Sequence, residues 1–126
     1  MKMTLKKLLK NQEFPKELFD KNGNQIYWEY SSGYWIKREY DSNNNRIYCE
    51  TSYGFWEKRE YDSNNNRIYC EDSDGHSYIK EYDSNNNLIN FEHSNGYSYI
   101  QEFDSNNNRI YYEDSNGMIT DNRPKK

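Results

Sequence analysis

The chain has 126 residues, a net charge of -4 at pH 7 and 14 tyrosines, but it contains no alanine and no valine. A chain of this length forms one domain, and so few aliphatic side chains make a conventional two-layer core hard to build. Lysine and arginine gather at both ends, so the body between them is acidic, which disfavours non-specific binding to DNA phosphates and suits a basic protein partner.

The first residues predict a short amphipathic helix over 3–12, because Leu5, Leu8 and Leu9 fall on one stripe. The helix should end before Pro15, and we expect residues 1–19 to form a helical cap at one end of the fold. Lysines interrupt the leucines, so the segment does not resemble a signal peptide. No apolar stretch is long enough to span a bilayer, and we expect a protein that acts inside the cell that makes it.

A block of 21 residues recurs along residues 20–119. The string Asp-Ser-Asn-Asn-Asn starts at Asp41, Asp62, Asp83 and Asp104, with a looser copy at Asp20, and the glycines from Gly33 to Gly117 keep the same period. A short period built on one supersecondary unit predicts a repeat array in which each unit packs on its neighbours.

Each unit contains two β-prone runs separated by turns. Residues 46–50 form the first run, a turn over 51–54 ends in Gly54, and residues 55–61 form the second. We therefore predict an all-β fold: an array of 21-residue β-hairpin repeats forming a twisted antiparallel meander of about nine strands. Residues 120–126 are expected to be a disordered tail.

The composition of the turns has a physical reason. Gly23 in the first copy aligns with an asparagine in the others, at Asn44, Asn65, Asn86 and Asn107. Glycine and asparagine tolerate a positive φ, so this column is predicted to be left-handed. The aspartate that opens each turn is expected to accept backbone N–H bonds as an Asx turn.

Two columns of residues in the strands are predicted to share one face, because they are two residues apart. One is mostly tyrosine and the other is glutamate throughout: Tyr27, Tyr48, Tyr69, Asn90 and Tyr111, then Glu29, Glu50, Glu71, Glu92 and Glu113. A glutamate that recurs in every repeat helps to fix strand register. We find no catalytic arrangement and expect no enzymatic activity.

No metal or cofactor is expected either. Cys49 and Cys70 should be two strands apart, roughly 9.6 Å at ~4.8 Å per strand, beyond the ~7 Å reach of a disulfide, so free thiols are expected. The Asp-x-Asn-x-Asn loops begin like calcium loops, but position twelve is serine rather than glutamate. His76 and His93, taken with the cysteines, lack the close-paired spacing of zinc sites.

Tryptophan beside lysine is confined to one half of the array, in Trp35-Ile36-Lys37-Arg38 and Trp56-Glu57-Lys58-Arg59. Aromatic anchors with charged rims are typical of protein interfaces. The candidate binding residues are therefore the anchors Trp35, Trp56, Tyr48 and Tyr69, with Glu50 and Glu71 meeting basic residues of a partner. Alternatively, the tryptophans pack under the N-terminal segment.

The run Lys37-Arg38-Glu39-Tyr40-Asp41, with Arg46-Ile47 after the loop, resembles a tyrosine–aspartate (YD) repeat, although the usual glycine of the loop is asparagine in four copies. Residues 111–117 resemble the hairpins of choline-binding and clostridial cell-wall-binding repeats, without their Gly-Trp signature. Over residues 14–118 the repeat is similar to small Asn- and Tyr-rich repeat proteins of phages and prophages.

The last resemblance implies a non-enzymatic inhibitor in the cytoplasm of a bacterial host cell. Its partner would be a protein or ribonucleoprotein, such as a CRISPR effector (an anti-CRISPR role) or another phage-defence nuclease, or a toxin that it neutralises. Binding of single-stranded nucleic acid through aromatics interleaved with Lys37, Arg38, Lys58 and Arg59 is an alternative that the acidic body disfavours, and carbohydrate binding is another. A sheet with two partly aromatic faces could also hide one of them in a homodimer.

Overall fold

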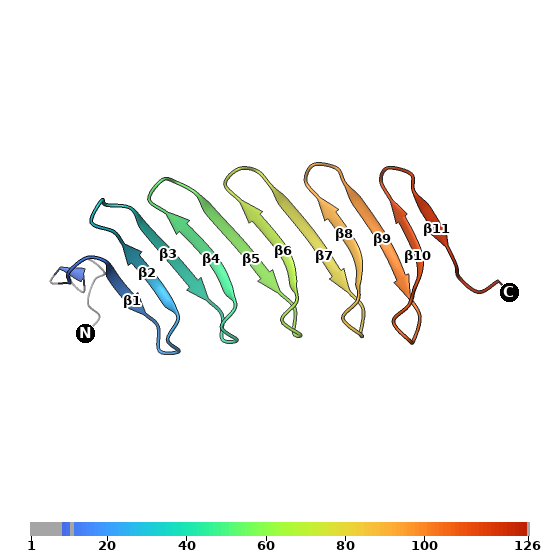
Figure 1. Cartoon of the computed structure of the whole chain (residues 1–126), viewed down its shortest axis with the longest axis horizontal. Coiled ribbons are helices and arrows are strands. Elements are labelled where there is room, and N and C mark those ends of the chain that lie inside the picture. The colour runs from blue at the N-terminus through green and yellow to red at the C-terminus, as the bar shows by residue number, and fades with distance from the viewer. Residues whose placement is uncertain (1–8, 11, 126) are drawn as a thin grey trace. The chain divides into compact units, whose positions relative to one another are not determined.

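The computed structural model describes residues 9–10 and 12–125. In this part of the chain eleven strands follow one another in a sheet whose order is the sequence order (Figure 1). They are β1 (Lys16–Phe19), β2 (Gln25–Glu29), β3 (Trp35–Tyr40), β4 (Arg46–Thr51), β5 (Trp56–Tyr61), β6 (Arg67–Asp72), β7 (Ser77–Tyr82), β8 (Leu88–His93), β9 (Ser98–Phe103), β10 (Arg109–Asp114) and β11 (Ile119–Asp121). The predicted all-β antiparallel meander is confirmed.

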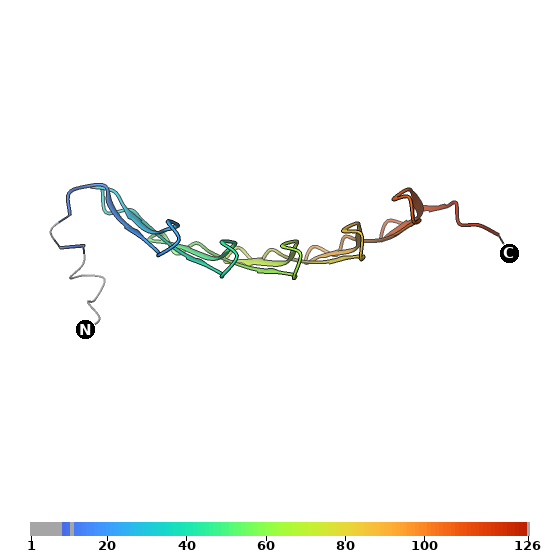
Figure 2. The same cartoon turned by 90° about the horizontal axis from the view of Figure 1, so that it is seen from below.

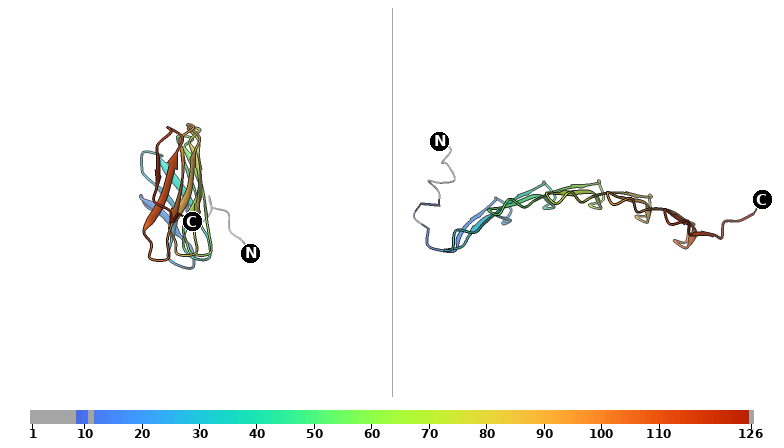
Figure 3. Two further views of the ribbon diagram at one scale, coloured as in Figure 1. Left: turned by 90° about the vertical axis from the view of Figure 1, so that its right-hand side faces the viewer. Right: turned by 90° about the horizontal axis from the view of Figure 1, so that it is seen from above.

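The chain divides into two compact units, and the boundary lies between Lys58 and Arg59, inside β5. In each unit the strands pair antiparallel with their sequence neighbours, as β3 does with β4 and β7 with β8. Within each unit the Asn-rich turns lie at one end of the strands and the other turns, which contain glycines such as Gly33 or Gly96, lie at the opposite end (Figure 1). Seen along its edge, each unit is a single layer of strands (Figures 2 and 3).

Burial is correspondingly shallow. Among the described residues the buried hydrophobic side chains are Leu9, Tyr27 and Cys49, and no side chain is fully buried. A conventional core is therefore missing from the described part of the chain, as the scarcity of aliphatic residues led us to expect.

Stacked aromatic rings replace the core in the second unit. The rings of Tyr78, Phe91, Tyr99 and Tyr112 form a row, here called the ring ladder, with successive centroids 6.0, 5.2 and 5.7 Å apart. Their planes are tilted by only 27°, 20° and 30° from one ring to the next. Offset-stacked pairs of this kind contribute about 0.5–1.5 kcal/mol each beyond the area that they bury.

The Asn-rich turns have the predicted backbone. Asn44 has a φ of 65°, its equivalents Asn65, Asn86 and Asn107 have a φ of 64°, and Gly23 has a φ of 85°. The Asp41 carboxylate accepts two backbone N–H bonds of 2.9 Å, from Asn43 and Asn45, which confirms the Asx turn.

Side-chain amides also link one Asn-rich turn to the next within each unit. Asn24 Nδ2 donates to Asn44 Oδ1 at 2.8 Å in the first unit, and Asn66 Nδ2 donates to Asn86 Oδ1 at 2.9 Å in the second. The second asparagine of the Asp-Ser-Asn-Asn-Asn motif therefore has two structural roles: it adopts the left-handed conformation, and its side chain accepts a hydrogen bond from the preceding repeat.

The sheet extends further than predicted at both ends. β1 lies within the segment that we assigned to a helical cap, and β11 includes Thr120 and Asp121, which we assigned to a disordered tail. β1 pairs with β2, with Glu17 opposite Trp28, and β11 pairs with β10, with Thr120 opposite Tyr112. The predicted helix over 3–12 falls largely on residues 1–8 and 11, outside the described residues.

Two further expectations concern the cysteines and the membrane. Cys49 and Cys70 are free thiols, as predicted. Among the described residues, no helix has the length and apolar character needed to cross a membrane.

Candidate functional site

Four of the six predicted binding residues share one face of the first unit, which we call the Trp–Glu face. Glu50 on β4 lies opposite Trp56 on β5 and opposite Lys37 on β3. Trp35 lies two residues before Lys37, and Tyr48 two residues before Glu50, so all of them point to the same side.

A lysine covers each tryptophan of this face. Lys37 Nζ lies 4.7 Å from the Trp35 ring centroid, and Lys58 Nζ lies 5.2 Å from that of Trp56. Both indoles are half-buried while both lysines are exposed. The face thus combines partly buried aromatic anchors with charged groups that solvent reaches.

The other two predicted residues, Tyr69 and Glu71 on β6, belong to the second unit. There the Tyr69 hydroxyl donates a 2.9 Å hydrogen bond to the Glu71 carboxylate. Tyr27 donates to Glu29 at 2.6 Å and Tyr111 to Glu113 at 2.9 Å in the same way. In these repeats the tyrosine and the glutamate two residues later hold each other.

The Tyr48–Glu50 pair differs from these three pairs. No described residue forms a hydrogen bond or ion pair with the Tyr48 hydroxyl, with the Glu50 carboxylate or with the Glu39 carboxylate, which lies opposite Tyr48. The pKa values reflect the difference. Burial is the largest cause of the raised pKa of Tyr48, and the negative charges of Glu50 and Glu39 raise it further. The largest cause of the raised pKa of Tyr69 is instead its hydrogen bond to Glu71.

A groove of about 440 Å³ lies over this part of the first unit. It brings together residues from the turn after β1 and from strands β1 to β4: Leu18, Asp20, Ile26, Tyr27, Lys37, Arg38, Glu39, Tyr40, Tyr48 and Glu50. The volume is in the range of pockets that bind small molecules. From the sequence we predicted Tyr48 and Glu50 as binding residues but did not select Glu39 or Tyr27, although both belong to columns that recur in the repeats.

Burial raises the pKa of Tyr27 to about 12, and its bond to Glu29 acts in the same direction. Tyr27 therefore stays protonated at physiological pH, and its hydroxyl is committed to Glu29. Tyr48, Glu39 and Glu50 also line the groove, and their side chains form no hydrogen bond or ion pair with the described residues.

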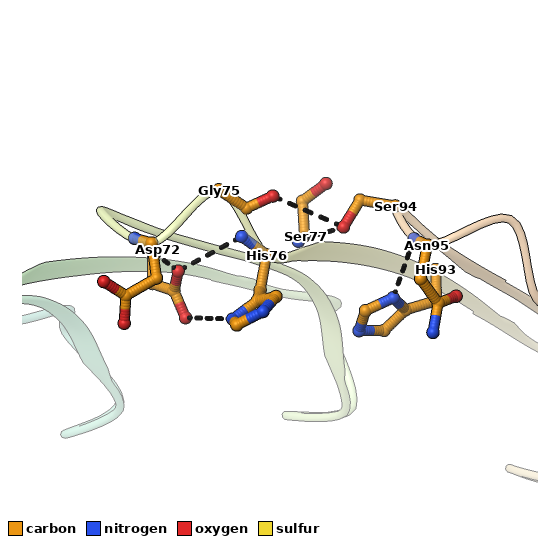
Figure 4. A network of polar contacts seen from close by, with 8 residues as sticks. Asp72, Gly75, His76, Ser77, His93, Ser94 and Asn95 are labelled. Carbon is orange, nitrogen blue, oxygen red and sulfur yellow. Dashed lines mark hydrogen bonds and ion pairs between the residues drawn. The ribbon is translucent and has the colours of Figure 1, made fainter.

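A second cluster lies in the turn between β6 and β7. The ligand atoms of Asp72, Asp74 and His76 lie within 4.8 Å of one another, and His76 Nδ1 is 3.6 Å from Asp72 Oδ2 (Figure 4). We considered His76 as a zinc ligand only together with the cysteines and so missed this alternation of Asp-x-Asp-x-His. Asp72 Oδ1 accepts the N–H groups of Asp74 and His76, as Asp41 does in its own turn, and these turn bonds explain the cluster without a ligand.

The same close-up shows how serine links neighbouring hairpins. Ser94 Oγ accepts the backbone N–H of Ser77 at 2.9 Å (Figure 4), and Ser52 Oγ accepts that of Trp35 at 3.2 Å in the first unit. Trp35 is therefore held in place at the start of β3 by the neighbouring Gly-containing turn.

No protein-family model matches the chain, and a comparison with curated proteins finds no match. Solved structures do match. The crystal structure of TcdB2-TccC3-TEV is similar with a TM-score of 0.61 at 14% identity, over 79% of this chain and 5% of that chain. The structure of the Photorhabdus luminescens Tc holotoxin pore is similar with a TM-score of 0.64 at 14% identity, over 84% of this chain and 7% of that one.

At this level of identity the likeness concerns the fold alone. It supports the YD-like β-hairpin repeat predicted from the sequence. The chain spans less than a tenth of the length of either toxin chain, so the likeness carries no activity or partner over to it.

Proposed function

We propose that this chain is a non-enzymatic binding protein that docks on a protein or ribonucleoprotein partner through the Trp–Glu face. The observation that carries the proposal is the grouping of Trp35, Trp56, Tyr48 and Glu50 on one side of the first unit. Tryptophan and tyrosine dominate the energetic centres of protein interfaces. Here they stand half-buried among charges that solvent reaches, as in a hydrophobic centre with a polar rim.

In its specific form, the proposal is that the chain inhibits a phage-defence nuclease, such as a CRISPR effector, in the cytoplasm of a bacterial host cell. Two observations support it. The repeat resembles those of small phage and prophage proteins, and the acidic body between the basic ends complements the basic surface with which a nuclease binds nucleic acid.

The aromatic geometry favours a protein partner over a nucleic acid or a sugar. Stacking of bases requires ring faces open to solvent, but the rings of the ladder cover one another at 5.2–6.0 Å. In the first unit one face of each Trp ring is covered by the ammonium group of Lys37 or Lys58.

The test is affinity capture of the tagged chain from a lysate of a bacterial host, with and without nuclease treatment, read by mass spectrometry. We expect one stoichiometric protein that survives nuclease and that is lost with the Trp35→Ala/Trp56→Ala variant. The matched control is Ile79→Ala/Ile100→Ala, which removes two side chains, each 46% exposed, from the corresponding face of the second unit. Equal capture by the two variants would refute the assignment of the face.

A further inference from the structure

One tyrosine–glutamate pair of the repeat lacks the hydrogen bond that the other three form. Tyr27, Tyr69 and Tyr111 each donate their hydroxyl to the glutamate two residues later. Tyr48 and Glu50 have the same spacing on β4 but make no such bond, and no described residue takes its place. Of the four Tyr–Glu pairs, this is the one whose hydroxyl and carboxylate have no partner among the described residues.

A second carboxylate faces the same ring. Glu39 on β3 is the direct cross-strand neighbour of Tyr48, and directly opposed residues have Cβ atoms about 4.5–5.5 Å apart. Glu39 is exposed and forms no side-chain hydrogen bond or ion pair with the described residues. The Tyr48 ring also stacks on no other described ring. An open aromatic ring thus lies between two carboxylates at the groove of the first unit.

The cations that neighbour these carboxylates are engaged elsewhere. Lys37 lies opposite Glu50, but its ammonium lies 4.7 Å from the Trp35 ring centroid. Arg38 donates from Nη1 to Gln25 Oε1 at 2.8 Å. Lys58, opposite Tyr48, lies over Trp56. The charge of Glu39 and Glu50 is therefore not neutralised by an ion pair within the described part of the chain.

We propose that this groove receives one arginine side chain from an exposed basic segment of the partner protein, with its guanidinium over the Tyr48 ring and its N–H groups donating to Glu39 and Glu50. The inference rests on the proposed docking function and gives the chemistry of its recognition. Charge complementarity selects the occupant, because two unpaired carboxylates beside an open ring attract a cation.

Arginine fits this arrangement better than lysine. Its guanidinium is planar, so it stacks on an aromatic ring while its donors reach acceptors on both sides in the plane. The ammonium of lysine is a compact, strongly hydrated charge that can approach one carboxylate closely but has no plane to stack. The partner's segment should therefore lose affinity when arginine is replaced by lysine.

The test needs no knowledge of the partner. Isotope-labelled protein is titrated with a short arginine-containing basic peptide and followed by amide NMR, beside peptides in which lysine or neutral citrulline replaces arginine. We expect shifts in β3 and β4 with the arginine peptide, smaller ones with lysine and none with citrulline. Glu39→Gln/Glu50→Gln should weaken the affinity about tenfold, or ~1.4 kcal/mol.

The matched control is Glu81→Gln/Glu92→Gln, which removes the same charge from exposed positions in the repeat where Asn90 replaces the tyrosine. Dispersed amide spectra of both variants establish that they fold. The proposal would be overturned if the two variants weakened peptide affinity equally, or if the lysine peptide caused shifts as large as the arginine peptide. Either result would mean that the peptide binds through general attraction between charges.

Capture of the partner separates this inference from the proposed function. If Trp35→Ala/Trp56→Ala abolishes capture while Glu39→Gln/Glu50→Gln leaves it unchanged, the docking face stands and the arginine site is wrong. If neither double variant affects capture, both proposals are wrong. Loss of capture in both, with the control variants retaining it, supports both.

Discussion

Replacing Asn86 by alanine tests whether the Asn-rich turns are held by their left-handed residue. Asn86 has a φ of 64°, a conformation that costs an ordinary L-residue about 1–2 kcal/mol and that asparagine tolerates better. Its Oδ1 also accepts bonds from Asn66 Nδ2 at 2.9 Å and Asn64 Nδ2 at 3.3 Å. The alanine variant has to adopt the same backbone without these two bonds.

The two effects can be separated by a second substitution. Exposed side-chain hydrogen bonds contribute at the low end of about 0.5–1.5 kcal/mol, so Asn86→Ala should lower the free energy of unfolding by about 1–2 kcal/mol in total. Asn86→Gly loses the same bonds but adopts the positive φ at no steric cost. It should be more stable than the alanine variant by about 1 kcal/mol.

Urea unfolding followed by circular dichroism measures these differences as shifts of the midpoint at constant slope. The control is Asn85→Ala, because Asn85 contributes its backbone N–H rather than its side chain to Asp83, and that bond remains. If Asn86→Ala is as stable as Asn85→Ala, or more stable than Asn86→Gly, the account of the turns is wrong.

Three further predictions address pH, packing and self-association. Backbone N–H bonds from the turn asparagines hold the pKa of the Asx-turn carboxylates of Asp41, Asp62, Asp83 and Asp104 below their usual 3.8. The unfolded chain therefore binds more protons in acid, so stability should be level above about pH 4 and fall below it; a rise in urea midpoint from pH 5 to pH 3 would contradict this. Phe91→Ala breaks the ring ladder and should cost about 2–3 kcal/mol, less than a fully buried phenylalanine, whereas Met118→Ala, 61% exposed, should change the unfolding free energy by less than about 0.5 kcal/mol. Light scattering at micromolar concentration should give twice the chain mass of 15.4 kDa, because a single-layer sheet leaves both faces open to a second copy; a monomer mass would exclude the dimer.

The repeat made the turns and strands predictable. A column occupied by Gly23 in the first copy and by asparagine in the others predicts a positive φ, and the φ of Asn44 agrees with it. The alternation of Tyr48 and Glu50 likewise placed both side chains on one face, and the observed pairing with Trp56 confirms this. Such features depend on local chemistry that is repeated in every unit, so one copy supports the interpretation of the next.

Features outside the repeat, or variable within it, were not predictable in the same way. The strand register shifts near the start of β4: Tyr40 pairs with Arg46 and Glu39 with Tyr48, so Ile47 forms a β-bulge. A run of alternating residues contains no signal for such a shift. β1 and β11 were missed because outer strands copy the repeat only loosely. Tyr48 and Tyr69 stand in the same sequence, Arg-Ile-Tyr-Cys-Glu, yet only Tyr69 bonds to the glutamate two residues later. This difference depends on side-chain conformations that the repeat does not encode.

The most direct test of the docking account is hydroxyl-radical footprinting of the captured complex, since tryptophan and tyrosine side chains report their own exposure. The account predicts that Trp35, Trp56 and Tyr48 become protected in the complex, while Phe91 and Tyr99 of the ring ladder react as in the isolated chain. Protection confined to the ring ladder, with Trp35 and Trp56 unchanged, would contradict it.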